Sequence, residues 1–583
     1  MKHRLLTLPL ALLLACSAER PVTSTSRAFE GSLASPLPQA AAPRLARYAM
    51  VVSAHPEASR IGTQILQRGG NAYDAAVAVQ FALAVALPAA GNIGGGGFLL
   101  YRDRNGSAGA LDFRETAPAR ASRDMYLDKQ GNLIENLSTA GPLAVGTPGT
   151  VAGMATLHKQ LGKLSWATLV QPAVTLATWG VALTAKEAAG LNRTRADFQK
   201  YNPGSTPAYL RPGGGEWQPG DTLHQPELAR TLARIRDQGR AGFYQGETAR
   251  LLLAAMKAGG GLVAQKDLDG YQAKWREPLR GHYRDYDVIT MPPPSAGGVA
   301  LLQMLQMLEP MDLAQAGYHT PLAVHFVTEA ERRAFADRAT YLGDPDFGTV
   351  PVQKLLDTDY NRQRAASFRS RGRATASSAV AAGVGLPGYE STETTHYNII
   401  DAFGNAVSCT TTLNGGYGSK VVVPGAGFLL NNEMDDFAAK AGAPNSYGLT
   451  GGKANAIAPG KRMLSSMTPT ILTRNGKVAL VTGSPGGSTI ITIVLQSILG
   501  IVDYGLNAQQ VVTAPRLHHQ WLPDQIDVEA GALLPAAQDT LRAHGYPINP
   551  RLPWGRLDLI HVRPDGVLEG GADPRGDDTA LGY

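Results

Sequence analysis

The pattern of apolar and polar positions divides the chain into a helix-rich part and a strand-rich part that meet near residue 394. Upstream, apolar runs bounded by Gly, Pro or Asn predict helices over 57–68, 72–87, 151–161, 169–177, 227–238, 247–258 and 301–308. Asn71, with Asp74 three residues on, is placed to cap the second of these helices. That helix is apolar on nearly every side and ends at Pro88, so it is expected in the core rather than across a membrane.

Downstream of residue 394, short alternating or β-branched runs predict strands. Thr394–Ile400 follows a loose Ala/Ser/Gly/Val-rich stretch, 374–391, and residues 471–480 predict a hairpin around an Asn-Gly turn. Further strands are expected over 98–101 and 287–291, and helices return over 488–502 and 536–545. Because helices and strands are segregated rather than alternating, the pattern indicates an α+β fold of packed layers.

Glycines cluster at 91–97, directly before the predicted strand 98–101. Nucleotide-binding glycine motifs follow a strand and open a helix, so the order here is the reverse. Close packing of backbone against backbone is the better interpretation of this cluster.

Composition narrows the class of protein. With 583 residues, 44% of them hydrophobic and 17% charged, the chain can form a large core and one to three globular domains. The formal charge of +6 is spread along the chain and is not gathered into a basic stripe with aromatic residues. A nucleic-acid partner is therefore not expected.

The N-terminal residues 1–15 predict an export signal, with a basic start and an apolar stretch too short to be a stable membrane anchor. The sequence ending at Cys16 resembles a bacterial lipobox, so Cys16 is a candidate for lipidation. The protein is therefore expected in the periplasm, with a lipid anchor in a bacterial membrane. An ordinary signal peptide cleaved a few residues later is the alternative. Residues 16–45 predict a flexible tether, and Cys409 is expected to be a small buried strand residue.

Thr394 stands where the loose stretch meets the predicted strand. A threonine hydroxyl needs an adjacent base before it can attack at neutral pH. That base is either a His/Asp pair or the residue's own α-amino group, whose pKa is about 8 and which exists only after the Glu393–Thr394 bond is cut. Thr394 could make this cut itself by attacking the Glu393 carbonyl to give an ester that water hydrolyses. Residue chemistry alone leaves an ordinary strand threonine as the alternative.

Four segments follow one another along the chain: Glu-Thr-Thr-His-Tyr at 393–397, and residues 429–437, 464–470 and 483–488. Together with residues 91–97, 112–115, 292–298 and 573–575, they resemble gamma-glutamyltransferase (gamma-glutamyl transpeptidase), a family of the N-terminal nucleophile hydrolase superfamily. The resemblance runs from about residue 49 to the C-terminus. It implies a four-layer αββα sandwich built from two fragments of one precursor, a large subunit of residues 46–393 and a small subunit of residues 394–583.

The resemblance also implies the catalytic residues. Thr394 matches the nucleophile and, together with Glu393, the autocleavage site. Thr412 matches the second threonine, whose hydroxyl orients the nucleophile. Gly486 and Gly487 match the oxyanion hole, which fits two glycines at a strand-to-helix turn with a helix N-terminus behind them. A plain tight turn is the alternative interpretation of this glycine pair.

The substrate-binding residues are implied in the same way. Arg114 matches the family's carboxylate-binding arginine, whose planar fork can pair with two oxygens at once. Its hydroxyl partners would be Ser465 and Ser466, and a cationic amino group would be held by Asn414, Glu433 and Asp436. Without the resemblance, Arg114 would be interpreted as part of a surface ion pair, and Asp435 and Asp436 as a solvated turn or a helix cap.

Residues around Tyr447 resemble the lid loop of some members, in which Tyr447 would close over the bound glutamyl group. A surface loop with an isolated tyrosine is the alternative. His396 is expected to support the site structurally rather than to act as the base. His518 and His519 are expected to be a packed strand-end pair rather than a zinc site, and neither a metal nor another cofactor is expected.

The implied activity is that of an exported, autoprocessed γ-glutamyltransferase. Glutathione and other γ-glutamyl compounds would be donors, and water, amino acids or dipeptides would be acceptors. A nearer alternative is a relative acting on another acyl group, such as a cephalosporin acylase or a poly-γ-glutamate-processing enzyme. The complete set of residues expected to bind the glutamyl donor argues against the acylase, and the lid argues against an enzyme that processes a long polymer. The other alternative is an unprocessed surface lipoprotein that binds amino-acid-like ligands without turnover.

Overall fold

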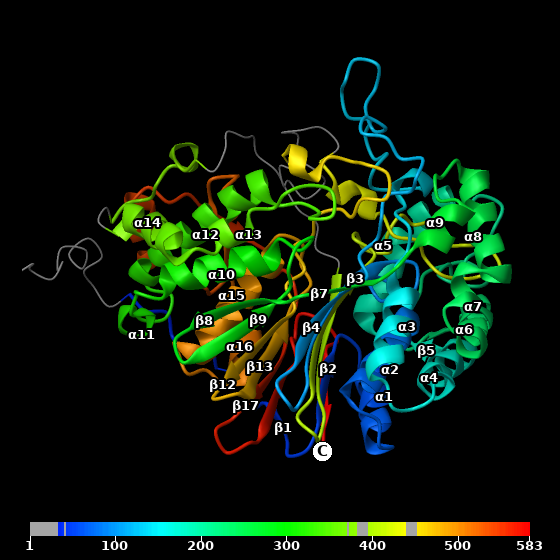
Figure 1. Ribbon diagram of the computed structural model, residues 1–583, viewed down its shortest axis with the longest axis horizontal. Helices are drawn as coiled ribbons and strands as arrows, with labels where there is room; N and C mark the ends of the chain where they lie inside the picture. Colours follow the sequence, from blue (N-terminus) through cyan, green and yellow to red (C-terminus); the bar gives the residue numbers. More distant parts are fainter. Residues whose placement is uncertain (1–32, 40–41, 370–371, 382–393, 439–451) are drawn as a thin grey trace, which may run out of the picture.

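Two seven-stranded sheets lie at the centre of the molecule and pack face to face, with helices covering the outer face of each sheet (Figure 1). This computed structural model describes residues 33–39, 42–369, 372–381, 394–438 and 452–583. All strand pairings within the two large sheets are antiparallel. The α+β class predicted from the sequence is confirmed.

The first sheet holds the strand that begins at Thr394. Its order is β19 (Thr579–Gly582), β2 (Met50–Ser53), β10 (Thr394–Ile400), β11 (Ala406–Thr412), β3 (Gly96–Arg102), β4 (Ala108–Asp112) and β7 (Lys274–Arg276). Strands from both sides of residue 394 are therefore interleaved, with β10 bonded to β2 and β11 bonded to β3.

The second sheet is assembled in the same interleaved way. Its order is β1 (Arg44–Ala46), β18 (Leu568–Gly571), β17 (Asp558–Val562), β13 (Lys477–Gly483), β12 (Thr470–Arg474), β9 (Tyr286–Thr290) and β8 (Leu279–Tyr283). The predicted hairpin is confirmed, because Asn475 and Gly476 both adopt the positive φ that a tight two-residue turn between β12 and β13 requires. Two smaller sheets join β14 (Leu517–His518), β15 (Ile526–Glu529) and β16 (Ile548–Arg551), and β5 (Val181–Ala182) with β6 (Thr222–Leu223).

The helices form two groups on opposite sides of the paired sheets (Figure 1). On the side of the first sheet lie α1 (Pro56–Gln67), α2 (Ala72–Ala86), α3 (Thr150–Leu161), α4 (Trp166–Trp179), α5 (Ala185–Tyr201), α6 (Pro226–Gln238), α7 (Ala241–Tyr244), α8 (Gly246–Gly259) and α9 (Gln265–Gly270). On the other side lie α10 (Gly297–Leu308), α11 (Leu313–Ala316), α12 (Pro321–Tyr341), α13 (Val352–Leu355), α14 (Thr358–Arg369), α15 (Thr489–Val502), α16 (Ala508–Thr513) and α17 (Pro535–Ala543). No helix of the described residues is long and apolar enough to cross a membrane.

Helix α2 shows how local sequence and burial agree. Asn71 caps it by accepting from the backbone N–H groups of Tyr73 and Asp74, while the Asp74 carboxylate accepts from the Asn71 N–H. Such a reciprocal cap stabilises a helix by about 1 kcal/mol. Every residue of α2 is buried, as its predominantly apolar sequence predicts, and the helix packs against β10 and β11.

The glycine cluster before β3 is a site of close backbone packing, as predicted. A Cβ atom at Gly94 would lie 2.1 Å from the Leu429 carbonyl oxygen, and one at Gly95 would lie 2.1 Å from the Thr412 carbonyl oxygen. Side chains are excluded here because the loop that precedes β3 runs directly against the end of β11.

One expectation about element placement is corrected in part, and the structure adds two strands that were not predicted. The segment 16–45 was expected to be a flexible tether, but part of it packs onto the body: Arg44–Ala46 forms β1, and the Ser35 hydroxyl donates to the Ala532 carbonyl at 3.0 Å. Strands β7 and β8 were not predicted within the helix-rich part, because their polar residues alternate with only partly buried ones and carry little apolar signal.

Candidate active site

Thr394 and Thr412 face each other across neighbouring strands. Thr394 is the first residue of β10 and pairs in register with Thr412, the last residue of β11. Cross-strand partners lie on the same face of a sheet, so both side chains point toward the second sheet. His396 and Asn398 follow on that same face, whereas Tyr397 packs into the core beneath the helices. Thr394 is 6% exposed and Thr412 is 2% exposed.

A small pocket lined largely by polar residues opens beside these two threonines. Nearly all of the described residues predicted to form the site line it: Arg114, Thr394, Thr412, Asn414, Glu433, Asp436, Ser465, Ser466 and Gly487, joined by Met467 and Ile490. Gly486 is not itself a lining residue but directly precedes Gly487, which is. The predicted residues Cys16, Glu393 and Tyr447 fall outside the part of the chain that the structure describes.

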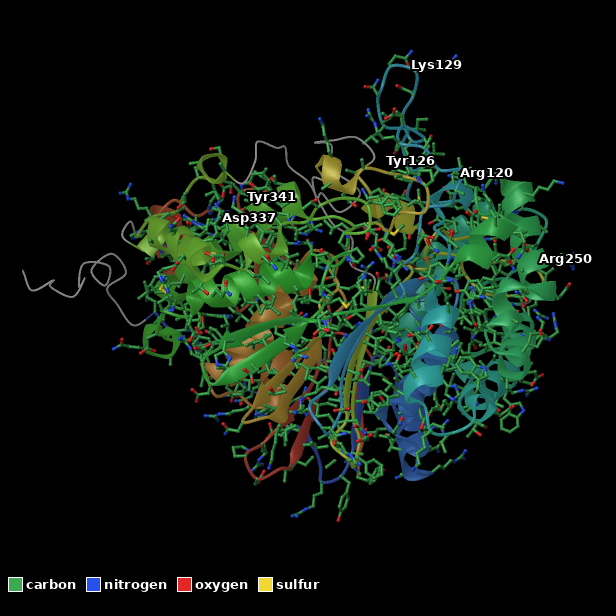
Figure 2. The ribbon with its side chains drawn as sticks, in the orientation of Figure 1. Arg120, Tyr126, Lys129, Arg250, Asp337 and Tyr341 are labelled. Carbon is green, nitrogen blue, oxygen red and sulfur yellow. The ribbon has the colours of Figure 1, made fainter. Side chains whose placement is uncertain are left out.

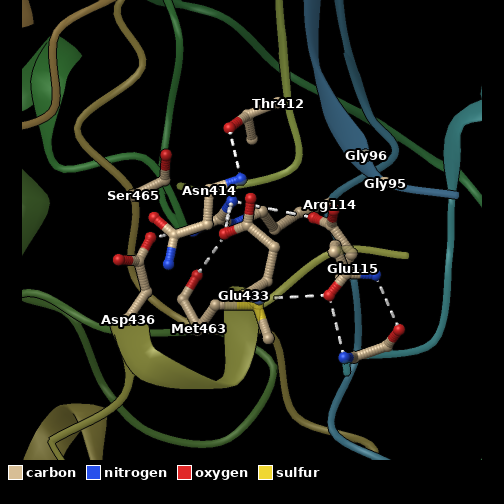
Figure 3. Close-up of polar contacts among 12 residues, drawn as sticks. Gly95, Gly96, Arg114, Glu115, Thr412, Asn414, Glu433, Asp436, Met463 and Ser465 are labelled. Carbon is tan, nitrogen blue, oxygen red and sulfur yellow. Dashed lines mark hydrogen bonds and ion pairs between the residues drawn. The ribbon is translucent and has the colours of Figure 1, made fainter. Parts of the chain in front are cut away.

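Arg114 is the centre of a buried charge cluster (Figure 3). It follows β4, and its guanidinium makes an ion pair of 2.5 Å with Glu433 and another with Asp436, both on the short 3₁₀ turn Glu433–Asp436. The Glu115 carboxylate lies 3.6 Å from the same guanidinium. The alternative of a surface ion pair is therefore wrong for Arg114, which is 1% exposed, and the alternative of a solvated turn is wrong for Asp436.

Burial and mutual repulsion change how these carboxylates titrate. Burial raises the pKa of Glu115 to about 8 and that of Asp436 to about 6, although the Arg114 charge opposes both shifts. The pKa of Glu433 is also raised well above its usual range, again mainly by burial. Arg114 remains a cation, because the three carboxylates around it hold its pKa above the usual value despite burial.

The loop after β11 places Asn414 at the pocket. Its backbone N–H donates to the Thr412 hydroxyl oxygen at 2.7 Å, and its side-chain amide donates to the Asn432 carbonyl at 3.0 Å. Asn414 adopts a φ of 74°, a left-handed conformation that asparagine tolerates better than most residues. Thr412 and the loop that carries Asn414 are thus fixed together.

Two glycines form the turn from β13 into α15. Gly486 and Gly487 have φ values of 134° and 60°, and a side chain at the first would strain the backbone. The Thr489 hydroxyl donates to the Gly486 carbonyl at 2.6 Å and fixes the turn. Because α15 begins directly behind, its N-terminus adds partial positive charge at the pocket wall.

Ser465 and Ser466 lie on a loop that runs beside the start of α10. The Ser465 N–H donates to the Pro294 carbonyl at 3.0 Å, and the Ala296 N–H donates to the Ser465 carbonyl at 2.7 Å. The Ser466 hydroxyl oxygen accepts from the guanidinium of Arg338 at 3.0 Å. Arg338 was missed in the sequence, because nothing distinguishes it from the other arginines of α12.

The buried histidines and the cysteine are occupied by structural contacts. His396 contacts the Thr410 hydroxyl at 2.8 Å and the Asn398 side chain at 3.0 Å, and burial lowers its pKa to about 3. Burial raises the pKa of Cys409 to about 12, which keeps its thiol protonated. His518 contacts Thr492 and Gln520. Among the described residues, no group of three His, Cys, Asp or Glu side chains is arranged to hold a metal ion.

Comparison with known proteins gives a consistent picture. The family model described as gamma-glutamyltranspeptidase matches residues 58–583. The chain is 46% identical to a glutathione hydrolase proenzyme of Pseudomonas sp. strain A14, over 93% of this chain and 95% of the relative. It is also 46% identical to the glutathione hydrolase proenzyme of Escherichia coli K12, covering 93% of each. The crystal structure of a cephalosporin acylase from Bacillus halodurans superimposes with a TM-score of 0.81 at 28% identity, covering 95% of this chain and 99% of that one.

Proposed function

This chain belongs to the gamma-glutamyltranspeptidase family, and from that premise we propose that it is a self-processing enzyme acting on glutathione and related γ-glutamyl compounds. It is an enzyme of the glutathione hydrolase and γ-glutamyltransferase class. The observation that carries the detailed proposal is the Thr394–Thr412 pair, which opens into the same pocket as Arg114, Asp436 and the two serines.

The nucleophile is Thr394, and its base is the amino group that cleavage of the Glu393–Thr394 bond releases. Thr394 Oγ attacks the Glu393 carbonyl carbon, the amide C–N bond breaks to give an ester, and water hydrolyses the ester to leave a free α-amine. An α-amine with a pKa of about 8 is partly neutral near pH 7 to 8 and can take the hydroxyl proton. The low pKa and the two side-chain contacts of His396 favour this intraresidue base over a histidine.

The pocket suits a group that carries a carboxylate and an ammonium on one carbon. Arg114, Ser465 and Ser466 would bind the α-carboxylate, and Asn414, Glu433 and Asp436 would bind the α-ammonium. The ion pairs from Arg114 to Glu433 and Asp436 support this assignment, because they bring the cationic and anionic halves of the pocket into contact. A zwitterion can then bind with each charge beside its complement.

Turnover repeats the acyl chemistry of maturation. Thr394 Oγ attacks the γ-carbonyl while its α-amine takes the proton, and the developing oxyanion is stabilised by the Gly486 and Gly487 turn at the N-terminus of α15. Collapse expels the amine, which takes the proton back, and leaves a γ-glutamyl ester on Thr394. Water then releases glutamate, or an amino acid or dipeptide accepts the glutamyl group.

Three further features belong to the same proposal. The four-layer arrangement is that of an N-terminal nucleophile hydrolase sandwich, with residues 46–393 and 394–583 as the large and small subunits. The N-terminal residues 1–15 direct export to the periplasm, where Cys16 supplies a lipid anchor. Tyr447 closes over the bound glutamyl group as part of a lid.

An acylase acting on another acyl group is the second candidate, because the cephalosporin acylase shares this fold across nearly the whole chain. The charged pocket favours γ-glutamyl donors, since a glutaryl group lacks the ammonium that Asp436 and Glu433 would bind. The two candidate functions are distinguished by comparing the release of p-nitroaniline from γ-glutamyl-p-nitroanilide and from glutaryl-p-nitroanilide. We expect kcat/KM to favour the γ-glutamyl donor by about 100-fold or more, the loss typical of an unpaired buried charge; a preference for glutaryl would support the acylase.

The role of Thr394 is tested with Thr394→Ala. Removing the hydroxyl eliminates both maturation and turnover, so we expect one full-length band on a denaturing gel and no p-nitroaniline release. The wild-type chain is expected to give two bands, and sequencing of the smaller one should begin at Thr394. Turnover by the uncleaved Thr394→Ala variant would exclude this mechanism. If the wild-type chain were not cleaved either, a role in binding ligands without turnover would gain support.

A further inference from the structure

Arg556 connects the two large sheets next to Thr394. It lies in the loop before β17, and its guanidinium Nη2 donates to the Thr394 carbonyl oxygen over 3.4 Å. Its own carbonyl accepts from the hydroxyl of Ser484, two residues before Gly486. Thr394 begins β10 of the first sheet, whereas Ser484 directly follows β13 of the second sheet. One residue therefore holds both the strand of the nucleophile and the turn that would bind the oxyanion.

The loop that carries Arg556 is packed directly against that turn. Gly555 has a φ of 61°, and a Cβ atom there would lie 3.0 Å from the Pro485 carbonyl oxygen. A Cβ atom at Gly486 would lie 3.3 Å from the Gly555 Cα. The bond from Arg556 thus fixes Thr394 relative to the turn. Because the accepting carbonyl belongs to the peptide bond after Thr394, the contact does not depend on the bond that maturation would cut.

Two carboxyl groups lie next to the Arg556 guanidinium. The side chains of Asp558 and Asp578 are withdrawn from water, and Asp578 lies 3.6 Å from Arg556 Nη1. The two carboxyl groups interact with each other, and neither accepts a hydrogen bond from any other residue in the part of the chain that the structure describes. Adjacent buried carboxylates repel each other, so the pair shares one proton.

The shared proton belongs mainly to Asp558. Burial and the Asp578 charge raise the pKa of Asp558 well above its usual range, whereas burial raises the pKa of Asp578 to about 6. At neutral pH, protonated Asp558 therefore donates to the Asp578 carboxylate, which faces Arg556. Nη1 of the guanidinium then lies beside this carboxylate, and Nη2 bonds to the Thr394 carbonyl. Because a guanidinium is planar and rigid, these two contacts fix its orientation.

We propose that Arg556 is a positioning residue for the Thr394 nucleophile: anchored by the Asp558–Asp578 pair, it keeps the start of β10 aligned with the glycine turn that receives the oxyanion. This inference rests on the proposed function, since it assigns a role in the same acyl-transfer site. It makes a specific demand, because Arg556 then contributes to the geometry of attack in maturation and in turnover, and not to binding of the amino-acid end of the donor.

The test compares turnover with ligand binding in Arg556→Gln and Arg556→Lys. Turnover is kcat/KM for γ-glutamyl-p-nitroanilide, and binding is the inhibition constant of glutamate in the same assay. For Arg556→Gln we expect kcat/KM to fall about 10- to 100-fold, the loss typical of reacting groups misplaced by about 1 Å, with the inhibition constant within about threefold. Conversion of the precursor into two fragments should slow as well. Arg556→Lys keeps the charge and should restore part of both losses.

The two aspartates supply a second comparison. In Asp558→Asn, the amide N–H can replace the donated proton, so kcat/KM should stay within about threefold of the wild-type value. In Asp578→Asn, the negative charge beside Arg556 is lost, and kcat/KM should fall about tenfold or more. Both substitutions keep the shape of an equally buried side chain, so a role in packing alone predicts equal effects.

Arg284→Gln is the matched control. Arg284 also holds a nearly buried aspartate, Asp503, at 2.9 Å, but it does so at the opposite end of α15 from the glycine turn. Its loss should lower the melting temperature and leave kcat/KM and the inhibition constant of glutamate within twofold. Mass spectrometry first establishes that each variant contains both fragments.

The maturation of the variants is itself informative. An Arg556→Gln chain that unfolds in one cooperative transition but stays uncleaved supports the inference, because self-cleavage uses the same hydroxyl. If this variant does not fold, Arg556→Lys and Asp578→Asn carry the comparison of kcat/KM with glutamate binding.

Three results would overturn the inference. They are an Arg556→Gln enzyme that matures and turns over like the wild type, equal losses of turnover and glutamate binding, and equal effects of Asp558→Asn and Asp578→Asn. The proposed function fails separately, and visibly, if the wild-type enzyme releases no p-nitroaniline from the γ-glutamyl donor. An active wild-type enzyme with indifferent Arg556 variants would refute the assignment of Arg556 alone.

Discussion

Asp436 illustrates how tertiary surroundings change the chemistry of a single residue. In the sequence it follows another aspartate in a short polar segment, a context typical of a solvated turn. In the fold it contacts Arg114, more than three hundred positions away, and is mostly withdrawn from water. Burial raises its pKa to about 6, so its charge changes within an accessible pH range.

Binding of the ammonium group should therefore depend on pH through Asp436. Glutamate, the product of hydrolysis, carries the same α-carboxylate and α-ammonium. Because Asp436 loses its negative charge below pH 6, the inhibition constant for glutamate should rise about tenfold between pH 7 and pH 5. The measurement is competitive inhibition of γ-glutamyl-p-nitroanilide cleavage across this range.

Two variants make this test specific. Asp436→Asn should bind glutamate more weakly at every pH and show a flat profile between pH 5 and 7. Asp435→Asn changes the neighbouring residue, which accepts from the Ser138 hydroxyl at 2.5 Å outside the pocket; because the Asp435 charge helps to raise the pKa of Asp436, this variant should keep a pH-dependent profile whose midpoint moves to lower pH. A wild-type profile that is already flat would refute the titration of Asp436.

At the scale of elements, the active site depends on how closely the glycine loop before β3 meets the end of β11. Gly95 approaches the Thr412 carbonyl, and the Asn92 side-chain amide donates to that same carbonyl at 2.9 Å. Thr412 in turn faces Thr394 and accepts from the Asn414 N–H. The loop thus positions the threonine pair although it contributes no side chain to the pocket.

Gly95→Ala should consequently impair both stability and maturation. The new Cβ would lie 2.1 Å from the Thr412 carbonyl oxygen, so β11 must shift, and overpacking of this kind costs about 1–3 kcal/mol. We expect a lower melting temperature and a slower appearance of the two fragments, followed on denaturing gels over time.

The control for this prediction is Gly270→Ala at the exposed end of α9. No described atom lies within 4 Å of a Cβ at that position, so the substitution should be neutral or stabilise by less than about 1 kcal/mol. Gly95→Ala maturing at the wild-type rate would show that the contact with Thr412 does not position the nucleophile.

At the scale of the whole molecule, the two proposed subunits form one core. Within the first sheet, β19, β10 and β11 from residue 394 onward are interleaved with β2 and β3 from before it. Within the second sheet, β18 is bonded to β1 and β12 to β9 across the same division. Cutting the bond before Thr394 leaves all of these backbone hydrogen bonds and the shared apolar layers intact.

The cleaved enzyme should accordingly behave as one folded unit. On gel filtration without denaturant, both fragments should elute together at the volume of the uncleaved Thr394→Ala chain, even after dilution to nanomolar concentration. Thermal unfolding should follow one cooperative transition, because neither fragment can complete either sheet alone. Separate elution of two fragments would contradict the interleaved core as the source of stability.

Some features of this protein follow from local sequence alone. The capped and mostly apolar α2, the Asn-Gly turn between β12 and β13, and the strand at Thr394 could all be predicted, because each is specified by neighbours within a few residues. The pocket residues, by contrast, were predicted from the resemblance of the sequence to the gamma-glutamyltransferase family, and not from the spacing of residues along the chain. The polar strands β7 and β8 were missed, since little of their burial is visible in a hydrophobic pattern.

The sequence by itself determined several of the helices and strands, and which residue types are available for acyl transfer. Only the tertiary structure decided that Arg114 meets Glu433 and Asp436, that Gly95 touches the backbone of Thr412, and that Arg338 reaches Ser466 from a distant helix. The physical reason is that helix caps and turns are satisfied by adjacent residues, whereas burial, ion pairing and pKa depend on groups that strand pairing brings together from hundreds of residues apart.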